Sequence, residues 1–128
     1  MKALLDTHTF LWWNTNDPRL STIARAFIAD GRNQVFFSAA SAWEIAIKAA
    51  RGCLDLPSAP DQYVADRLRS NGFSPLPIQI SHTLEVYHLP RHHADPFDRL
   101  VVAQSRLEKM PLLSGDSDIE RYDVQRIW

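Results

Sequence analysis

The sequence contains one cysteine and no hydrophobic run long enough to cross a membrane. Cys53, as the lone thiol, excludes an internal disulfide framework and a cysteine-based zinc cluster, and it favours a reducing compartment. Lys2 precedes apolar residues, as in a secretory signal, but Asp6 and His8 interrupt the run and no small-residue cleavage site follows. We therefore expect a cytoplasmic protein with no membrane partner.

The sequence also lacks an excess of charge of either sign. Its 14 Lys and Arg residues against 15 Asp and Glu residues give a formal net charge of −1. This balance argues against a constitutive nucleic-acid binder that relies on bulk positive charge, although a local basic face is not excluded. The 128 residues contain no internal repeat, low-complexity tract or linker, so we expect one domain over residues 1–128.

Short apolar runs alternate with helical patterns along the chain. Strands are predicted at 2–6, 34–38, 73–78, 111–114 and 123–128, the third at a sheet edge because of its two prolines. Helices are predicted from residue 7, at 21–31, 39–52 and 61–71, from Ser81 to before Pro90, and from about 95 to 109. This alternation predicts an α/β fold with a mainly parallel sheet of about five strands in a three-layer α/β/α arrangement.

Four acidic residues fall at or shortly after the ends of predicted strands. Asp6 ends the first strand, Glu44 lies in the helix after the second, Asp98 opens the long helix, and Asp116 follows the fourth strand. Ligands of parallel α/β sheets bind outside the carboxyl ends of the strands. If the fold gathers these acids, the cluster requires cations, and a hard divalent ion such as Mg²⁺ or Mn²⁺ is the natural counter-charge.

Each acid also has a purely structural explanation, and the weakest is that of Asp6, which at the end of a buried strand caps only the next turn. Asp95 with Pro96 is typical of a helix N-cap followed by proline at the first helical position, and Asp98 at the third position is favoured and kept ionised by the helix dipole. Glu44 has an i,i+4 partner in Lys48, although the helix around it is mostly apolar. Asp116 and Asp118 in "SGDSD" are also typical turn residues.

Other polar and aromatic residues give weaker signals. Thr7 and Ser38 either begin helices or donate hydrogen bonds to the acids, and the sequence favours neither. His92 and His93 are interpreted as surface residues rather than as proton shuttles. The tryptophans are interpreted as core or dimer-interface residues rather than base-stacking platforms: Trp12, Trp13 and Trp43.

Four blocks, in order and nearly end to end, carry a resemblance to a known family: "LLDTHTFLWW", "FSAASAWEIAIKAARGCLDLP", "LPRHHADPFDRLVVAQS" and "PLLSGDSDIERYDVQRIW". The sequence resembles the PIN-domain ribonucleases, and specifically the VapC-like toxins of bacterial type II toxin–antitoxin pairs. The resemblance implies a PIN-like fold and an acidic metal site at Asp6, Glu44, Asp98 and Asp116. Asp118 and Ser114 are auxiliary candidates, Ser114 standing where a threonine is common.

The resemblance also implies an activity and partners. The expected reaction is Mg²⁺- or Mn²⁺-dependent hydrolysis of RNA phosphodiester bonds. The expected partners are an RNA substrate, a second copy of the chain in a homodimer, and a cognate antitoxin in a toxin–antitoxin hetero-oligomer. The antitoxin's C-terminal segment is expected to wrap the toxin, with a basic side chain in the acidic pocket and its remaining residues in an apolar groove.

Three other classes of protein compete with this interpretation. A receiver-like signalling domain requires an acid pair after the first strand and an aspartate after the third, and "LLDTHTF" and "FSPLPIQIS" supply neither. A haloacid-dehalogenase phosphatase requires Asp-x-Asp, whereas residue 8 is histidine. A catalytically silent PIN-shaped module that binds RNA or protein is disfavoured because all four site acids are present.

Overall fold

The computed structural model describes residues 1–128, and its elements alternate as the sequence predicts. In chain order they are β1 (Lys2–Leu5), α1 (Thr7–Thr15), α2 (Thr22–Ala29), β2 (Gln34–Ser38), α3 (Ala39–Ala50), α4 (Pro60–Asn71), β3 (Ser74–Leu76), α5 (Ile80–Glu85), the 3₁₀ helix η1 (Val86–His88), α6 (Pro96–Glu108), β4 (Leu112–Leu113), the 3₁₀ helix η2 (Ser117–Arg121) and β5 (Arg126–Ile127).

The five strands form one sheet in the order β3-β2-β1-β4-β5, and every neighbouring pair is parallel. The proline-containing β3 lies at the edge, as predicted, because proline cannot donate a ladder hydrogen bond. The chain leaves β1 toward β2 on one side and returns to β4 on the other, so strand order reverses between β1 and β4. Such a reversal is where open parallel sheets bind ligands.

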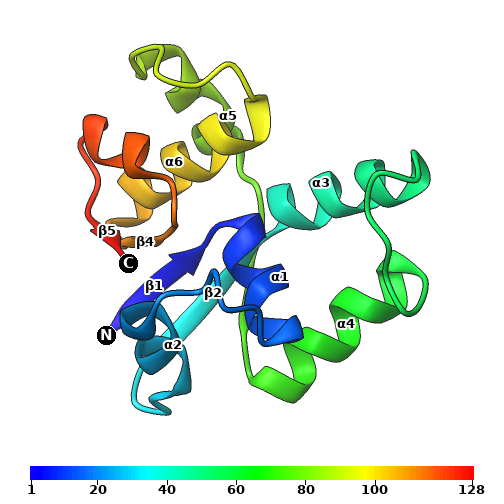
Figure 1. The fold of residues 1–128 in the computed structure, drawn as a ribbon. Coiled ribbons are helices and arrows are strands. Elements are labelled where there is room, and N and C mark those ends of the chain that lie inside the picture. The colour runs from blue at the N-terminus through cyan, green and yellow to red at the C-terminus, as the bar shows by residue number, and fades with distance from the viewer.

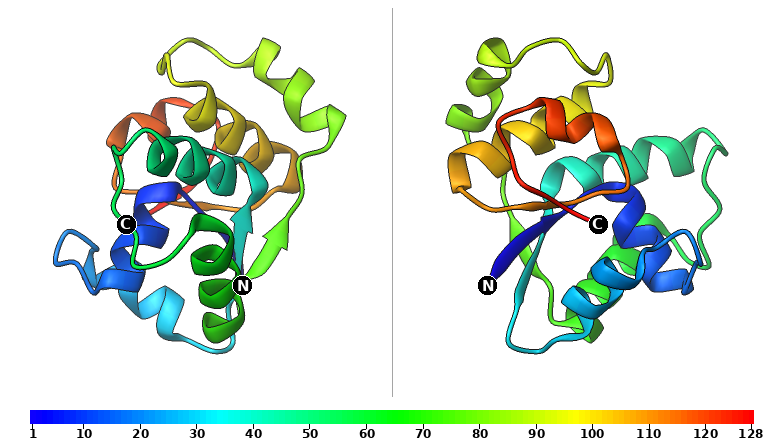
Figure 2. Two further views of the ribbon diagram at one scale, coloured as in Figure 1. Left: turned by 90° about the vertical axis from the view of Figure 1, so that its right-hand side faces the viewer. Right: turned by 60° about the vertical axis from the view of Figure 1, so that its left-hand side comes forward.

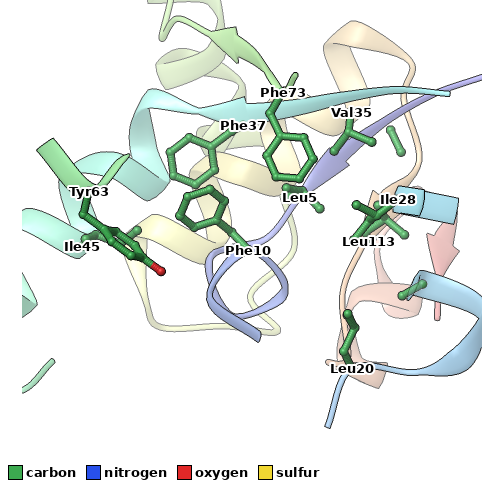
Figure 3. Close-up of a cluster of buried hydrophobic side chains, with 12 residues drawn as sticks. Leu5, Phe10, Leu20, Ile28, Val35, Phe37, Ile45, Tyr63, Phe73 and Leu113 are labelled. Carbon is green, nitrogen blue, oxygen red and sulfur yellow. The ribbon is translucent and has the colours of Figure 1, made fainter. Parts of the chain in front are cut away.

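Side chains of the central strands alternate between two hydrophobic cores. Ala3 and Leu5 of β1 point into one core, whereas Leu4 points into the other. The first core contains Phe10 of α1, whose ring lies against Phe37 of β2 at 4.2 Å between centroids (Figure 3). Both faces of these strands are buried, which is why their sequences are continuously apolar rather than alternating.

Helices cover both faces of the sheet. α1, α2 and α4 contribute to the first core, while α6, η2 and the chain after η1 contribute to the second. Figure 1 and the right-hand view in Figure 2 show these two groups on opposite sides of the sheet, with α3 rising from the end of β2. The predicted three-layer α/β fold with a five-stranded parallel sheet is confirmed.

The elements differ from the prediction mainly at their ends. α5 begins at Ile80, one residue before the predicted Ser81, because Gln79 takes the N-cap position. The last strand is limited to Arg126–Ile127 rather than 123–128, since only these residues pair with β4. Gly72 ends α4 in the left-handed conformation with φ of 67°, where glycine carries no steric penalty. None of the helices is long and apolar enough to span a membrane.

Candidate active site

A pocket of about 390 Å³ opens at the carboxyl ends of β1 and β4, where the strand order reverses. Three of the predicted acids line it, each from a different part of the chain: Asp6, Asp98 and Asp116. Ser114, which is fully buried, also contributes to the pocket wall. The fold therefore gathers carboxylates that are far apart in the sequence, as the positions of the strands predict.

Asp6 is held by the start of α1. Its Oδ1 atom accepts hydrogen bonds at 2.7 Å from both the backbone N–H and the hydroxyl of Thr9, so Asp6 is the N-cap of this helix. Thr9 is fully buried, and its place beneath the carboxylate is fixed by the core. One oxygen of Asp6 is thus committed to the helix, and the other oxygen accepts no hydrogen bond from α1.

Asp98 lies in the first turn of α6, and Asp95 is the N-cap of that helix, as predicted. The Asp95 carboxylate accepts from the backbone N–H of Phe97 at 2.8 Å. Burial, together with the charges of Asp95, Glu44 and Asp6, raises the pKa of Asp98 to about 6, and only the charge of His93 acts in the opposite direction. Desolvation and like charges therefore act against the helix dipole, although a carboxyl with this pKa still ionises at neutral pH.

Asp116 is held at both oxygens. Its Oδ1 accepts from the backbone N–H of Asp118 at 2.9 Å, and its Oδ2 accepts from Nε2 of His93 at 2.5 Å. Nδ1 of His93 lies 2.8 Å from the Tyr122 hydroxyl, and the imidazole stacks on the Tyr122 ring. Burial acts to raise the pKa of Asp116, but the hydrogen bonds from His93 and Asp118 and the charges of His93 and Arg126 bring it below its usual value.

Glu44 lies behind the pocket rather than in its lining. Its residue is 3% exposed, Oε1 accepts from the Thr7 hydroxyl at 2.6 Å, and Oε2 pairs with Lys48 at 2.6 Å. The ion pair with Lys48 that the sequence predicts is therefore present, and Glu44 is buried as the apolar helix around it suggests. The negative charge of Glu44 also contributes to the raised pKa of Asp98. Of the two alternatives that the sequence left open, Thr7 donates a hydrogen bond to an acid, Glu44. Ser38 instead begins a helix as the N-cap of α3, and its hydroxyl donates to Gln104.

Of the two auxiliary residues predicted from the sequence, Ser114 belongs to the pocket and the Asp118 side chain does not. Ser114 accepts from the backbone N–H of Asp116 at 3.1 Å and so helps to shape the turn that carries it. Asp118 lies outside the pocket lining, with its carboxylate 3.9 Å from Arg121. No group of three or more His, Cys, Asp or Glu side chains is drawn together closely enough to form a finished metal cage.

The donor set nevertheless fits a hard divalent cation. Carboxylate and hydroxyl oxygens line the pocket, and these are the ligands that Mg²⁺ and Mn²⁺ prefer. Mg²⁺ is usually bound through one or two carboxylates and keeps several waters, so an open pocket of spaced acids suits it. The raised pKa of Asp98 shows an acidic centre in which like charges and burial outweigh the balancing charge.

A groove of about 580 Å³ continues from this pocket between α1, the end of α3 and the chain that leads to α4. Four residues line both the pocket and the groove: Thr7, His8, Trp12 and Arg19. Apolar side chains supply much of the remaining groove wall: Leu11, Ile45, Leu54, Leu56, Pro57 and Tyr63. A groove with a partly apolar wall therefore leads directly to a carboxylate pocket.

Several residues near the site were not recognised from the sequence. His93 is not a free surface residue, because it contacts Asp116 and its side chain is only 10% exposed. Trp12 lines the pocket as well as packing against the core, whereas Trp43 is 57% exposed beside Phe97. Thr9 three positions after Asp6 carried a usable signal, since this is the spacing of an N-cap contact.

Comparison with known proteins identifies relatives. A family model described as PIN domain matches residues 3–125. Ribonuclease VapC16 of Mycobacterium tuberculosis (strain ATCC 25618 / H37Rv) is 47% identical over 70 residues, which span 52% of this chain and 50% of that protein. The matched part is thus about half the length of this relative. These matches confirm the resemblance found in the sequence.

Solved structures share the fold at low sequence identity. VapBC2 from Rickettsia felis, crystallised with a promoter DNA fragment, superposes with a TM-score of 0.71 at 11% identity and covers 100% of both chains. A toxin–antitoxin complex from Klebsiella pneumoniae gives 0.62 at 16% identity, covering 90% of this chain and 87% of that one. FitAcB from Neisseria gonorrhoeae gives 0.62 at 17% identity, covering 98% and 96%.

Proposed function

The chain belongs to the PIN-domain family, and from this premise we propose that it is a metal-dependent ribonuclease toxin held inactive by a cognate antitoxin. The single observation that carries the proposal is the pocket lined by Asp6, Asp98 and Asp116 at the reversal of strand order. The relative named a ribonuclease supports the choice of RNA as substrate. Residues 1–128 act in this proposal as one PIN-like domain.

The three pocket carboxylates would hold one or two Mg²⁺ or Mn²⁺ ions, with Ser114 shaping the turn beneath them. Such an ion, when bound, supplies a water of lowered pKa and a counter-charge for the departing oxygen. The chain's own task is to orient the carboxylates, and it does so through Thr9 for Asp6, the Asp95-capped helix for Asp98, and His93 for Asp116.

Glu44 has a separate part in this proposal. Its two carboxylate oxygens are bound by Thr7 and Lys48, so it contributes negative charge behind Asp98 from a fixed position. It serves either as a further ligand, once Lys48 turns away, or as the group that orients the attacking water. Asp118 contributes through its backbone N–H to Asp116, and not through its carboxylate.

The groove provides the support for the antitoxin as partner. Its apolar wall and its continuity with the carboxylate pocket suit a peptide segment that buries apolar side chains and ends on a basic one. A guanidinium in the pocket would replace the missing cations and exclude the substrate at the same time. The toxin–antitoxin complexes among the similar folds agree with this partner.

The homodimer is proposed on exposed apolar side chains of α5 and η1. Ile80 is 78% exposed, Leu84 66% and Tyr87 88%, and their spacing of four and three residues places them on one helical face. Substitution Leu84→Lys is expected to shift the chain from dimer to monomer in light scattering, and an unchanged mass would remove this surface from consideration.

A cytoplasmic setting agrees with an RNA substrate and with the lone thiol of Cys53.

The test is cleavage of total RNA by antitoxin-free protein in Mg²⁺, Mn²⁺ or EDTA. Asp98→Asn keeps the size of the side chain and removes its charge, so cleavage should fall by at least about a hundredfold. Asp66→Asn, an exposed helix acid paired with Arg69, is the matched control and should leave cleavage intact. Metal-independent cleavage would overturn the proposed metal dependence. No cleavage by folded, metal-loaded protein, or equal cleavage by the Asp98→Asn protein, would overturn the proposal in favour of a silent binding module.

A further inference from the structure

Two identical short turns occur in the chain, and only one of them lies at the pocket. Asp17 and Arg19 form the first, and Asp30 and Arg32 form the second. In each turn the arginine donates from its backbone N–H and from Nε to Oδ1 of the aspartate, at 2.9 and 3.0 Å in the first turn and at 3.0 Å for both bonds in the second. Each terminal Nη2 then reaches Oδ2, at 2.7 Å and 2.9 Å.

The surroundings of the two arginines differ completely. Arg19 lies over the Trp12 ring at 5.0 Å from its centroid, and it lines both the carboxylate pocket and the groove. It is the only arginine or lysine in the pocket lining. Arg32 contacts neither cavity, and its side chain is 90% exposed. The shared turn therefore explains the hydrogen bonds of Arg19, but not its place at the mouth of the site.

We propose that Arg19 forms a phosphate-binding subsite, which holds the backbone phosphate of a nucleotide next to the one cleaved. This inference rests on the proposed ribonuclease function. A carboxylate pocket repels the polyanionic backbone of RNA wherever it is not neutralised, so a cation at its rim is needed to hold the flanking strand. A guanidinium fork matches the oxygens of a phosphate in two parallel hydrogen bonds.

The geometry leaves Arg19 free to act in this way. Only two of its five side-chain N–H donors are used by Asp17, so three are available to a ligand. Its side chain is 68% exposed, and an exposed ion pair of this kind contributes little to stability, so sharing the guanidinium with a phosphate carries a small cost. Stacking on Trp12 and the bond to Asp17 limit the positions of the fork without burying it.

The experiment compares Arg19→Gln with its twin Arg32→Gln, both in the Asp98→Asn background so that RNA is bound and not cleaved. The probe is a short fluorescein-labelled single-stranded RNA of mixed sequence, with binding followed by fluorescence anisotropy over a range of salt concentrations. Arg19→Gln should weaken binding roughly tenfold, the size of one charge-assisted contact. It should also reduce the salt slope by about 0.7, the value for one phosphate contact on a single strand.

Arg32→Gln loses the same turn and the same charge, so it should leave both the affinity and the salt slope unchanged. Arg19→Lys keeps the charge without the fork and should recover the salt slope but only part of the affinity. Equal behaviour of the two glutamine variants, or an absence of RNA binding, overturns the subsite. Wild-type protein is tested separately for cleavage of total RNA. If it fails to cleave while Arg19→Gln still weakens binding, Arg19 stands as an RNA phosphate contact and the proposed ribonuclease function falls.

Discussion

Helix α6 carries two polar sites that the fold treats in opposite ways. At its first turn, Asp98 faces the carboxylate pocket, where burial and three neighbouring acids raise its pKa to about 6. Six residues later, Gln104 is fully buried and belongs to a polar network that we define as Ser38, Gln104, His82 and Glu108. The first site leaves charge uncompensated, whereas the second satisfies its members within the chain.

The buried network joins three segments, the end of β2, α5 and α6, beside the second core. Gln104 accepts from the Ser38 hydroxyl at Oε1, and its Nε2 donates to the Pro77 carbonyl at 3.3 Å and lies 3.4 Å from Nδ1 of His82. His82 accepts from the Gln79 backbone N–H at 3.0 Å and contacts Glu108 at 2.9 Å through Nε2. No buried side-chain nitrogen or oxygen of the protein lacks a hydrogen-bond partner.

The buried network stabilises the fold, whereas the carboxylate pocket is a site that the fold positions for a ligand. A satisfied buried network stabilises the folded chain, because removing one member leaves the others without partners in a medium that cannot replace them. A group of carboxylates facing one another destabilises the folded chain until a cation arrives. Ser38 and Gln104 also fix α3 against α6, and so the network sets the helices that carry Glu44 and Asp98.

Gln104→Ala should produce the largest change in stability. It removes the partner of Ser38 and leaves a cavity in the second core, so the free energy of unfolding should fall by about 2–4 kcal/mol. Gln62→Ala, on the exposed face of α4, is the control and should change it by less than about 0.5 kcal/mol. Urea denaturation followed by circular dichroism measures both. Equal effects would mean that the network does not stabilise the fold.

His93→Ala comes next, and it tests the pocket rather than the fold. Without the Nε2 contact, Asp116 is free to turn, and the dissociation constant for Mn²⁺ should rise by roughly 10–100-fold, as for other groups that orient metal ligands. His93→Gln places an amide N–H near the same position and should recover most of the affinity. His92→Ala removes only an edge contact to Tyr122 and serves as the control. Electron paramagnetic resonance of free Mn²⁺ reports the binding, and an unchanged His93→Ala value would contradict the role of Asp116 as a ligand.

The sequence predicts the parts of this comparison that depend on local pattern. Apolar runs predict the strands, and the rule that ligands bind at the carboxyl ends of parallel strands predicts a site that includes Asp6, Asp98 and Asp116, which do line one pocket. Asp95 was recognised as a cap because Pro96 follows it at the first helical position. The role of these acids as metal ligands stays a prediction.

The rest depends on contacts between distant segments. His93 and Asp116 are 23 positions apart, and the fold brings the segment before α6 against the turn after β4. The network around Gln104 joins residues up to 66 positions apart, and a glutamine in an apolar helix gave no sign of its partner. The raised pKa of Asp98 follows from burial, from the charge of Asp95 at the start of the same helix, and from the charges of Glu44 and Asp6 on two other segments, and the helix pattern alone does not predict the burial.

Asp98→Asn should stabilise the metal-free protein. The pKa of Asp98 rises from 3.8 to about 6 on folding, so ionisation costs the folded chain free energy as the pH rises through this interval, and the cost is complete at neutral pH. After a discount for solvent screening, replacing the acid should raise the free energy of unfolding by on the order of 1 kcal/mol in EDTA. The gain should vanish below about pH 4, where the acid is protonated in both states.

The control for this prediction is Asp66→Asn, which should show no such dependence on pH, and Mg²⁺ should stabilise wild type more than the Asp98→Asn protein. Denaturant melts at neutral and acidic pH, with and without Mg²⁺, measure all of these quantities. A destabilised Asp98→Asn protein at neutral pH in EDTA would show that the pocket acids are balanced within the chain, and the contrast between the two sites on α6 would fail.

Glu108→Gln should have the smallest effect, and it locates where the buried network gains its stability. The Glu108 side chain is 39% exposed, whereas its partner His82 is 2% exposed. The glutamine keeps an oxygen that accepts from Nε2 of His82, and water replaces what is lost, so the free energy of unfolding should change by less than about 0.5 kcal/mol. If urea denaturation instead shows that Glu108→Gln lowers the free energy of unfolding as much as Gln104→Ala does, the stability of the network comes from the contact between Glu108 and His82. The contrast between a buried network that does not depend on charge and a charged pocket would then no longer hold.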